Sequence, residues 1–430
     1  MKKSSARWIT VTLILCILIG GILIYSKSVS DKGAADDRQG TAASQAEERL
    51  MKTSEPTPTV NDTSQTSEPS EQTAEPTEMR GVWIPYMSLQ LSEDERNEEA
   101  FKKKIGAMFD TCVSHKLNTV IVHVRPFGDA VYPSEYFPWS HIISGQQGKG
   151  VDFDPLKLLI EEAHRKGLSF HAWINPFRIS TGHTPPSLSS DNPYSVWKNG
   201  SDIFSYQDGI YYDPSSSRVR KLIVDGAREL AEKYDIDGIQ IDDYFYPSEE
   251  EGYDKQSYAS YLKTVSQDAV PLTLSQWRKN NVNMLIAGIY SAVHQVKEDI
   301  VFGISPQCNF DNNEKLSADI QSWCRIEGYV DYICPQLYVS PNHPVFPFNA
   351  LADEWKKTVQ NENIRLYFGL GLYKAGTDAD GGTWQDGADH LKNEIEYLRK
   401  IGADGFMLYA FDYLTADSAK EEVVQTMAVL

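Results

Sequence analysis

Two adjacent acids are the residues of this chain best suited to do chemistry. Asp242 and Asp243 follow an apolar stretch, residues 236–241, in which three of the six residues are isoleucine. Such β-branched residues favour a buried strand, and Pro247 ends the strand pattern soon after the acids. Burying an unpaired charge costs several kcal/mol, so two acids at the end of a buried strand indicate a catalytic pair. The structural alternative is that one aspartate caps the following loop and the other pairs with an arginine.

The elements that must position this pair repeat along the chain from residue 79 to residue 430. The expected strands are residues 80–86, 118–126, 168–177, 236–246, 300–306, 330–338, 365–372 and 403–411. The expected helices are residues 101–116, 155–166, 217–234, 274–298, 315–327, 351–362, 388–400 and 420–429. Eight strand–helix units predict an α/β fold, a (β/α)8 TIM barrel whose first and last strands pair. The alternative is an open doubly wound sheet, but no glycine-rich phosphate turn follows Tyr86.

A barrel requires polar residues to gather where its strands end, because catalytic residues of such barrels lie at that face. The sequence meets this requirement after the second, third, fifth, sixth, seventh and eighth expected strands. Along the fourth strand the side chains alternate, so Asp242 should point into the barrel mouth with Gln240 beneath it.

Two connections are much longer than usual, residues 179–216 and residues 248–273, and both are rich in tyrosine. They are expected either to wall a sugar cleft or to pack as insertions with small cores of their own. The first should contain a hairpin turn around residues 207–209.

Composition excludes several classes of function. The formal net charge is −19 at pH 7 and no basic stripe interrupts it, so we expect no nucleic-acid partner. The 23 Tyr and 9 Trp suit stacking on sugar rings, although aromatic residues also fill ordinary cores. The five cysteines match no zinc motif or disulfide framework, and the nine histidines form no ligand pattern. We therefore expect no metal and no cofactor.

The first 78 residues predict an exported protein. Lys2, Lys3 and Arg7 precede an uncharged apolar run at residues 8–25, which is long enough to span a bilayer. We expect residues 1–26 to be a single-pass membrane anchor with the remainder outside the cell; a cleaved signal peptide and secretion are the alternative. Residues 27–78 lack Phe, Trp and Tyr and are rich in Ser, Thr, Pro and Glu, so we expect a disordered linker.

Eight short motifs, in this order, resemble those of one family. They are RGVWI (80–84), RPFGDAVYPS (125–134), WINPFR (173–178), YYDP (211–214), DGIQIDDYFYP (237–247), WRKNNVN (277–283), GISPQ (303–307) and DYICPQLY (331–338). Together they are similar to the glycoside-hydrolase-like family 10 lipoproteins, or YngK/DigH-type glycosyl hydrolase domain. The resemblance implies a TIM-barrel glycosidase of the bacterial envelope that cleaves peptidoglycan strands, particularly those stripped of stem peptides. Residues 307–313 depart from the Gly/aromatic/Arg-Asn segment of many relatives, which leaves the substrate open.

Glycosidic cleavage needs a proton donor for the leaving oxygen and a second group for the positive charge at the anomeric carbon. Asp242 resembles the nucleophile of amylase-type barrels, and the pair also resembles those of hexosaminidases that use the substrate's own acetamide. The acid is open between Asp243, Asp129 and Asp412, with Asp129 the preferred third catalytic candidate. The residues expected to contact the sugar are Arg125, Trp173, Asn175, Arg178, Tyr244, Tyr246, Gln307, Asn309, Gln336, Tyr338, Tyr373 and Asp412.

The expected partners are an N-acetylated polysaccharide and, through the N-terminal segment, the membrane. A tethered glycan-binding module without activity is the alternative function, since an aromatic cleft would serve both roles. A pure binding site gains little from two adjacent acids, so the Asp-Asp pair favours the enzyme.

Overall fold

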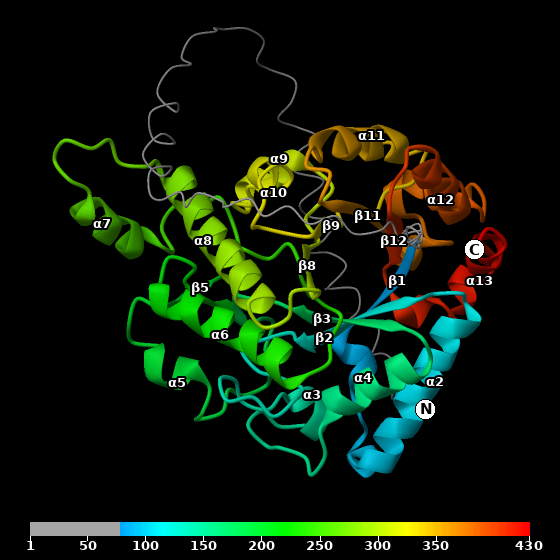
Figure 1. The fold of residues 1–430 in the computed structure, drawn as a ribbon, viewed down its shortest axis with the longest axis horizontal. Coiled ribbons are helices and arrows are strands. Elements are labelled where there is room, and N and C mark those ends of the chain that lie inside the picture. Colours follow the sequence, from blue (N-terminus) through cyan, green and yellow to red (C-terminus); the bar gives the residue numbers. More distant parts are fainter. Residues whose placement is uncertain (1–77) are drawn as a thin grey trace, which may run out of the picture. The chain divides into compact units, whose positions relative to one another are not determined.

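The computed structural model of this chain describes residues 78–430 (Figure 1). The expected anchor and all but the last residue of the expected linker lie outside the described residues. Within the described part, no helix combines the length and the apolar character needed to cross a membrane.

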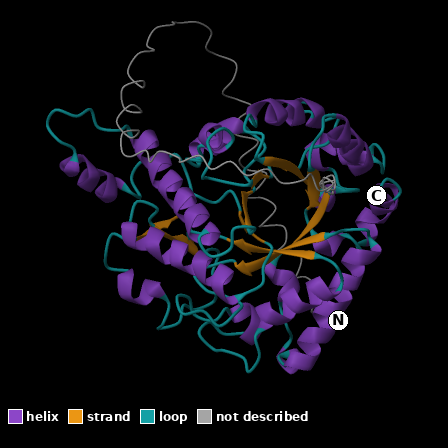
Figure 2. Cartoon of the chain, in the orientation of Figure 1, coloured by secondary structure: helices purple, strands orange, loops and turns teal. Residues whose placement is uncertain are grey.

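The described residues form a closed parallel barrel (Figure 2). The strand β1 pairs with both β2 and β12, which closes the sheet and confirms the expected pairing of the first and last strands. The sixth position is divided into two short strands that both pair with β11. The barrel strands are β1 (Met79–Ile84), β2 (Thr119–Arg125), β3 (Ser169–Ile174), β7 (Gly238–Ile241), β8 (Val301–Ile304), β9 (Tyr332–Ile333), β10 (Gln336–Leu337), β11 (Arg365–Leu370) and β12 (Gly405–Leu408).

Helices surround the barrel, as the sequence predicts for a (β/α)8 fold (Figure 1). Most use side-chain caps; for example, Asp154 accepts hydrogen bonds from the first turn of α4, which has Pro155 at its start. The longer helices are α2 (Glu98–Ser114), α4 (Pro155–Arg165), α6 (Ser217–Lys233), α7 (Lys255–Thr264), α8 (Leu274–His294), α11 (Phe348–Thr358), α12 (His390–Lys400) and α13 (Lys420–Met427), and the shorter ones include α3 (His141–Ser144) and α5 (Pro193–Trp197).

One expected helix, residues 315–327, is wrong. The chain instead forms α9 (Phe310–Lys315) and the single-turn α10 (Ile320–Trp323). Ser317 lies between them with a φ of 63°, a left-handed conformation that a continuous α-helix does not contain. Asp319 then caps α10 by accepting a hydrogen bond from the backbone of Ser322.

The two long connections both contain structure of their own. After β3, the strands β4 (Arg178–Ser180), β5 (Ile203–Tyr206) and β6 (Gly209–Tyr212) form an antiparallel sheet, which confirms the expected hairpin around residues 207–209. After β7, helix α7 and its loop project from the body (Figure 1). Tyr258 and Tyr261 of α7 pack against Trp277, with ring centroids 5.3 and 6.0 Å away.

The barrel interior is filled by large side chains that face glycines. The interior cluster consists of Trp83, Ile121, Trp173, Tyr332, Cys334 and Met407. A Cβ atom added at Gly303 would lie 2.1 Å from the ring of Tyr332, and one at Gly369 would lie 2.9 Å from the ring of Trp83. The alternate faces of the strands contribute to a larger core with the surrounding helices. Glycines on the strands therefore make the room that the interior aromatics occupy.

This packing predicts the effect of one added methyl group. Gly303→Ala should lower the free energy of unfolding by about 1–3 kcal/mol, because Tyr332 must move within a closed interior. The matched control is Gly106→Ala in α2, where the new Cβ would lie 3.4 Å from a Glu162 carboxyl oxygen and helix propensity improves. Thermal unfolding followed by circular dichroism compares the two. Equal transition temperatures would show that the interior tolerates the methyl group and that this packing is wrong.

Candidate active site

The two acids directly follow β7, a strand whose position is fixed by side-chain contacts in the barrel interior. Gln240 of β7 is fully buried, accepts a hydrogen bond from the Trp83 indole Nε1 at 2.5 Å and contacts the Met407 sulfur at 3.3 Å. Two residues further on, Asp242 accepts a hydrogen bond from Trp173, another member of the interior cluster. Asp242 therefore lies on the interior side of β7, above Gln240, where side-chain alternation places it.

Asp242 is held by the end of β3. Its Oδ2 accepts from Trp173 Nε1 at 3.1 Å, and Asn175 Nδ2 lies 3.1 Å from both carboxyl oxygens. The residue is 4% exposed. Burial raises its pKa from 3.8 to about 7, with the charge of Asp243 adding to the rise and Arg178 opposing it.

Asp243 is held by two other strands. Gln307, after β8, donates to Oδ2 at 2.9 Å, and Gln336 of β10 donates to Oδ1 at 3.0 Å. Burial also raises the pKa of Asp243, against these amide hydrogen bonds. Because ionisation of one acid disfavours ionisation of its neighbour, the two residues should titrate as an interacting pair.

Arg178 is the cation whose charge acts on both aspartates. Its Nε donates to the Pro126 carbonyl at 2.9 Å, and its guanidinium lies 4.8 Å from the Phe127 ring and 5.5 Å from the Tyr244 ring. Its charge acts to lower the pKa of both aspartates. Among the described residues, however, no ion pair joins Arg178 to either acid.

Aromatic rings line the mouth beside the acids. Tyr338 lies edge-on to Trp83 at 6.4 Å and 5.4 Å from Tyr409, and Tyr373 is 5.9 Å from Tyr409. Burial and the nearby Asp242 raise the pKa of Tyr409 to about 12. Tyr244, directly after the acids, is 49% exposed and offers its ring to solvent. Such a wall can stack on sugar rings.

Two residues of this arrangement were not among the expected site residues, Trp83 and Tyr409. Trp83 donates a hydrogen bond to Gln240, which lies beneath the pair. Tyr409 directly follows β12, the last barrel strand. The signal for Tyr409 was available, since it lies near the end of the eighth expected strand, residues 403–411. The role of Trp83 depends on its bond to a residue 157 positions away, which the sequence does not display.

Arg125, an expected sugar contact, is buried and forms no hydrogen bond or ion pair with either acid of the pair. Its guanidinium lies 4.2 Å from the Phe137 ring, and a Cβ at Gly226 of α6 would approach its Nη1 to 2.9 Å. Arg125 is therefore buried between the barrel and α6. The physical reason is an irregularity in the β2–β3 register between His123 and Arg125, which interrupts the alternation of faces.

Tyr246 and Asp129 are also placed away from the pair. The Tyr246 hydroxyl accepts from Asn281 of α8 at 3.3 Å. Asp129 is buried and accepts from Gln147 at 2.9 Å, while Asn192 donates to the same Gln147 at 3.2 Å. Asp129 thus braces the loops that follow β2 and β3, and the structure gives it no contact with Asp242 or Asp243.

Asn309 and Asp412 have local partners. Asn309 caps α9 by accepting from the backbone of Asn312, and Asp412 accepts from the Ser88 hydroxyl at 2.9 Å. Asn312 in turn donates to Gln307 Oε1 at 3.0 Å and so orients the amide that holds Asp243. The segment that departs from many relatives, residues 307–313, is therefore part of the support of the pair.

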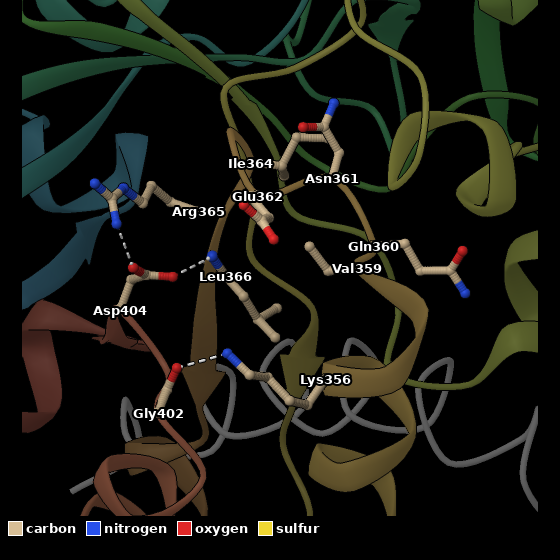
Figure 3. Close-up of a pocket in the computed structure, with 10 residues that line it drawn as sticks. All are labelled: Lys356, Val359, Gln360, Asn361, Glu362, Ile364, Arg365, Leu366, Gly402 and Asp404. Carbon is tan, nitrogen blue, oxygen red and sulfur yellow. Dashed lines mark hydrogen bonds and ion pairs between the residues drawn. The ribbon is translucent and has the colours of Figure 1, made fainter.

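A hollow of about 280 Å³ lies at the opposite end of the barrel (Figure 3). It surrounds Arg365, the first residue of β11, whereas the acids follow the last residue of the parallel strand β7. Three of its charged groups have partners: Arg365 contacts Asp404 at 2.9 Å, and Lys356 donates to the Gly402 carbonyl at 2.6 Å. This hollow therefore does not extend the site. The residues that the structure describes also contain no cluster of possible metal ligands.

The family model described as glycosyl hydrolase-like 10 matches residues 78–385. This chain belongs to the glycosyl hydrolase-like 10 family. It is 34% identical to glycosyl hydrolase YngK of Bacillus subtilis over 339 residues, which cover 73% of this chain and 64% of YngK. It is 28% identical to glycosyl hydrolase DigH of Escherichia coli K12 over 390 residues, 84% of this chain and 87% of DigH. The chain thus spans less than two thirds of YngK and most of DigH.

Solved structures of glycosyl hydrolases share the barrel. The glycoside hydrolase domain of PgaB (BpsB) from Bordetella bronchiseptica aligns with a TM-score of 0.53 at 14% identity, over 81% of this chain and 99% of that one. The catalytic domain of β-amylase from Paenibacillus polymyxa gives 0.52 at 13% identity, over 81% and 98%. At these identities the likeness concerns the fold.

The raised pKa of Asp242 predicts how stability responds to pH. A carboxyl with a pKa of 3.8 unfolded and about 7 folded binds its proton more tightly in the folded state. Its burial therefore weakens folding progressively as the pH rises from about 4 to about 7, and the effect levels off above about 7. Asp242→Asn removes this charge and should raise the unfolding temperature by about 3 °C or more at pH 8, and by less at pH 5.

A second buried aspartate supplies the contrast. Asp254 forms a two-bond ion pair with buried Arg278, at 2.7 and 2.8 Å. Asp254→Asn should therefore destabilise the fold by about 3–5 kcal/mol, because it leaves a buried cation unpaired. Calorimetry at both pH values measures the two variants. A loss of stability in Asp242→Asn at pH 8 would mean that Asp242 is a structural ion-pair partner.

Proposed function

We propose that this protein is a cell-envelope glycoside hydrolase that cleaves N-acetylated glycan, with peptidoglycan strands as the substrate. The observation that carries the proposal is the buried Asp242–Asp243 pair at the barrel mouth, fixed by donors from three other strands. Membership of a glycosyl hydrolase-like family supports the reaction class. The aromatic wall around Tyr338 and Tyr409 supports a sugar as the ligand.

In the proposed mechanism the two acids have different roles. Asp242, with a pKa of about 7, is protonated often enough at neutral pH to give its proton to the leaving glycosidic oxygen. Asp243 accepts two amide hydrogen bonds, which favour its ionised form. As a carboxylate it orients the acetamide N–H and stabilises the positive charge that develops.

The bonds change in two steps. The acetamide oxygen forms a bond to the anomeric carbon while the glycosidic bond breaks and the leaving oxygen takes the proton of Asp242. Water then attacks the anomeric carbon, the acetamide oxygen leaves, and Asp242 recovers a proton from that water. No external oxidant, reductant or further reactant is required.

Neutralising each acid tests the assignment. Asp242→Asn and Asp243→Asn should each reduce turnover of peptide-free peptidoglycan strands by about 10²-fold or more. The control is Asp110→Asn, an exposed aspartate of α2 that pairs with Lys166. Mass spectrometry of the released fragments measures the rates. If both variants lose less than tenfold, the pair is structural; if wild type binds strands and cleaves none, the domain is a glycan-binding module.

The same proposal locates the barrel domain outside the cell membrane, with residues 1–26 as the anchor. The support is the basic residues Lys2, Lys3 and Arg7 before an uncharged apolar run. Protease added to intact cells should remove the barrel domain and leave an N-terminal fragment with the membrane. A domain that is cut only after lysis would overturn this location, and a domain found in the medium would indicate a cleaved signal peptide.

A further inference from the structure

We propose that the side chain of Arg125 binds a small monovalent anion, such as chloride, in a closed site between the barrel and α6. The site lies behind β2 and not at the barrel mouth, and the inference does not depend on the proposed reaction.

Arg125 carries a buried charge that no described protein group neutralises. The residue is 1% exposed, and within residues 78–430 none of its three side-chain nitrogens has a hydrogen-bond partner or an ion pair. Arg278 shows the contrast, because it is also buried but bonds the Asp254 carboxylate at 2.7 and 2.8 Å. Burial lowers the pKa of Arg125, yet an arginine stays protonated in proteins, so proton loss cannot remove this charge. The guanidinium therefore requires a partner.

Two tyrosine hydroxyls that experience the charge of Arg125 are also buried and have no partner among the described residues. Tyr132 comes close because the loop after β2 folds back, with the Val131 N–H donating at 3.0 Å to the carbonyl of the residue before Arg125. Tyr212, at the end of β6, lies against the same loop, where a Cβ at Gly128 would be 3.0 Å from its hydroxyl. Burial raises the pKa of both phenols, so both keep their protons and can donate to an anion.

The two carboxylates whose charge acts on Arg125 have other partners. Glu229 of α6 pairs with Lys233 at 3.0 Å, and Asp129 accepts from Gln147 at 2.9 Å. Of the groups that act on Arg125, Asp129 acts least and the two tyrosines act most. The second oxygen of Asp129 has no partner among the described residues, so water between Asp129 and Arg125 is the competing arrangement.

The excess of donors favours an anion over water. Water can accept from only some of the guanidinium and phenol donors, and it brings protons that need acceptors of their own. The Phe137 ring lies 4.2 Å from the guanidinium carbon, and a Cβ at Gly226 of α6 would approach Nη1 to 2.9 Å. These walls favour a small ion, and the nearby carboxylates favour a single negative charge because they would repel a second one.

The backbone beside this site also supports the barrel mouth. The Arg125 carbonyl accepts from the Asn175 N–H at 2.9 Å, and the next carbonyl, that of Pro126, accepts from Arg178 Nε at 2.9 Å. An anion on the guanidinium would therefore stabilise the segment to which two residues of the candidate active site are bonded.

Crystals of the full-length protein grown with bromide in place of chloride test the site directly, because bromide scatters anomalously. The expected result is an anomalous peak in contact with the Arg125 guanidinium and with the hydroxyls of Tyr132 and Tyr212. A site that holds only water, or an Arg125 side chain that turns to Asp129, would overturn the inference.

Thermal unfolding measures the same binding in solution. In full-length protein in non-ionic detergent, at constant pH and ionic strength, replacing gluconate by chloride should raise the Tm, because a ligand of the folded state stabilises it. Arg125→Met should lose this chloride-dependent rise. The matched control, Arg165→Gln, removes an exposed arginine that bonds Glu162 twice at 2.7 Å, and it should keep the rise.

Tyr132→Phe and Tyr212→Phe decide the question if Arg125→Met does not fold. Each variant keeps the guanidinium and removes one donor, so the chloride concentration at half-saturation should increase by about tenfold or more. An unchanged half-saturation in both variants, or equal wild-type Tm values in chloride and gluconate, contradicts the proposal. None of these measurements uses a glycan, so the proposed glycosidase function can fail without changing their outcome.

Discussion

Two carboxyl groups buried next to each other are the constraint on which the rest of this structure depends. Neither acid finds its partners on its own strand: Asp242 is held from β3, and Asp243 from the ends of β8 and β10. Burying the pair is tolerable only where these donors converge, and they converge only when the parallel strands are in register around a closed barrel. The bond from Trp83 to Gln240 fixes β7 below the acids. The fold and the site are thus specified by the same contacts.

Two buried aspartates of this domain, Asp254 and Asp242, have opposite kinds of partner. Asp254 meets Arg278 in a fully paired interaction that supports the connection after β7. Asp242 receives only neutral donors, and burial therefore shifts its proton equilibrium upward. A paired acid stabilises a loop, whereas an acid with neutral partners retains the freedom to exchange a proton. This difference in partners separates a structural aspartate from one suited to acid–base chemistry.

Much of the fold could be predicted because it depends on local patterns. Each strand carries a run of apolar residues, and alternation alone placed Asp242 above Gln240. The errors arose where local pattern and backbone geometry disagree. The left-handed conformation of Ser317 divides an expected helix. The register irregularity before Arg125 places that side chain on the outer face of the barrel, against α6. Gln307 and Gln336 were expected near the site as sugar contacts. Their hydrogen bonds to Asp243, 64 and 93 residues away in the sequence, depend on the tertiary structure and could not be predicted from local pattern.

The insertions after β3 and β7 differ in how closely they are tied to the chemistry. The α7 segment packs its tyrosines on Trp277 and projects from the body, and these contacts do not involve the acids. Arg178, in contrast, is also the first residue of β4 and pairs in register with Tyr211 of the small sheet. A change in the length of that hairpin would move the arginine. Arg178 therefore couples the first insertion to the acids, whereas the second is joined to the body through the ion pair of Asp254 with Arg278.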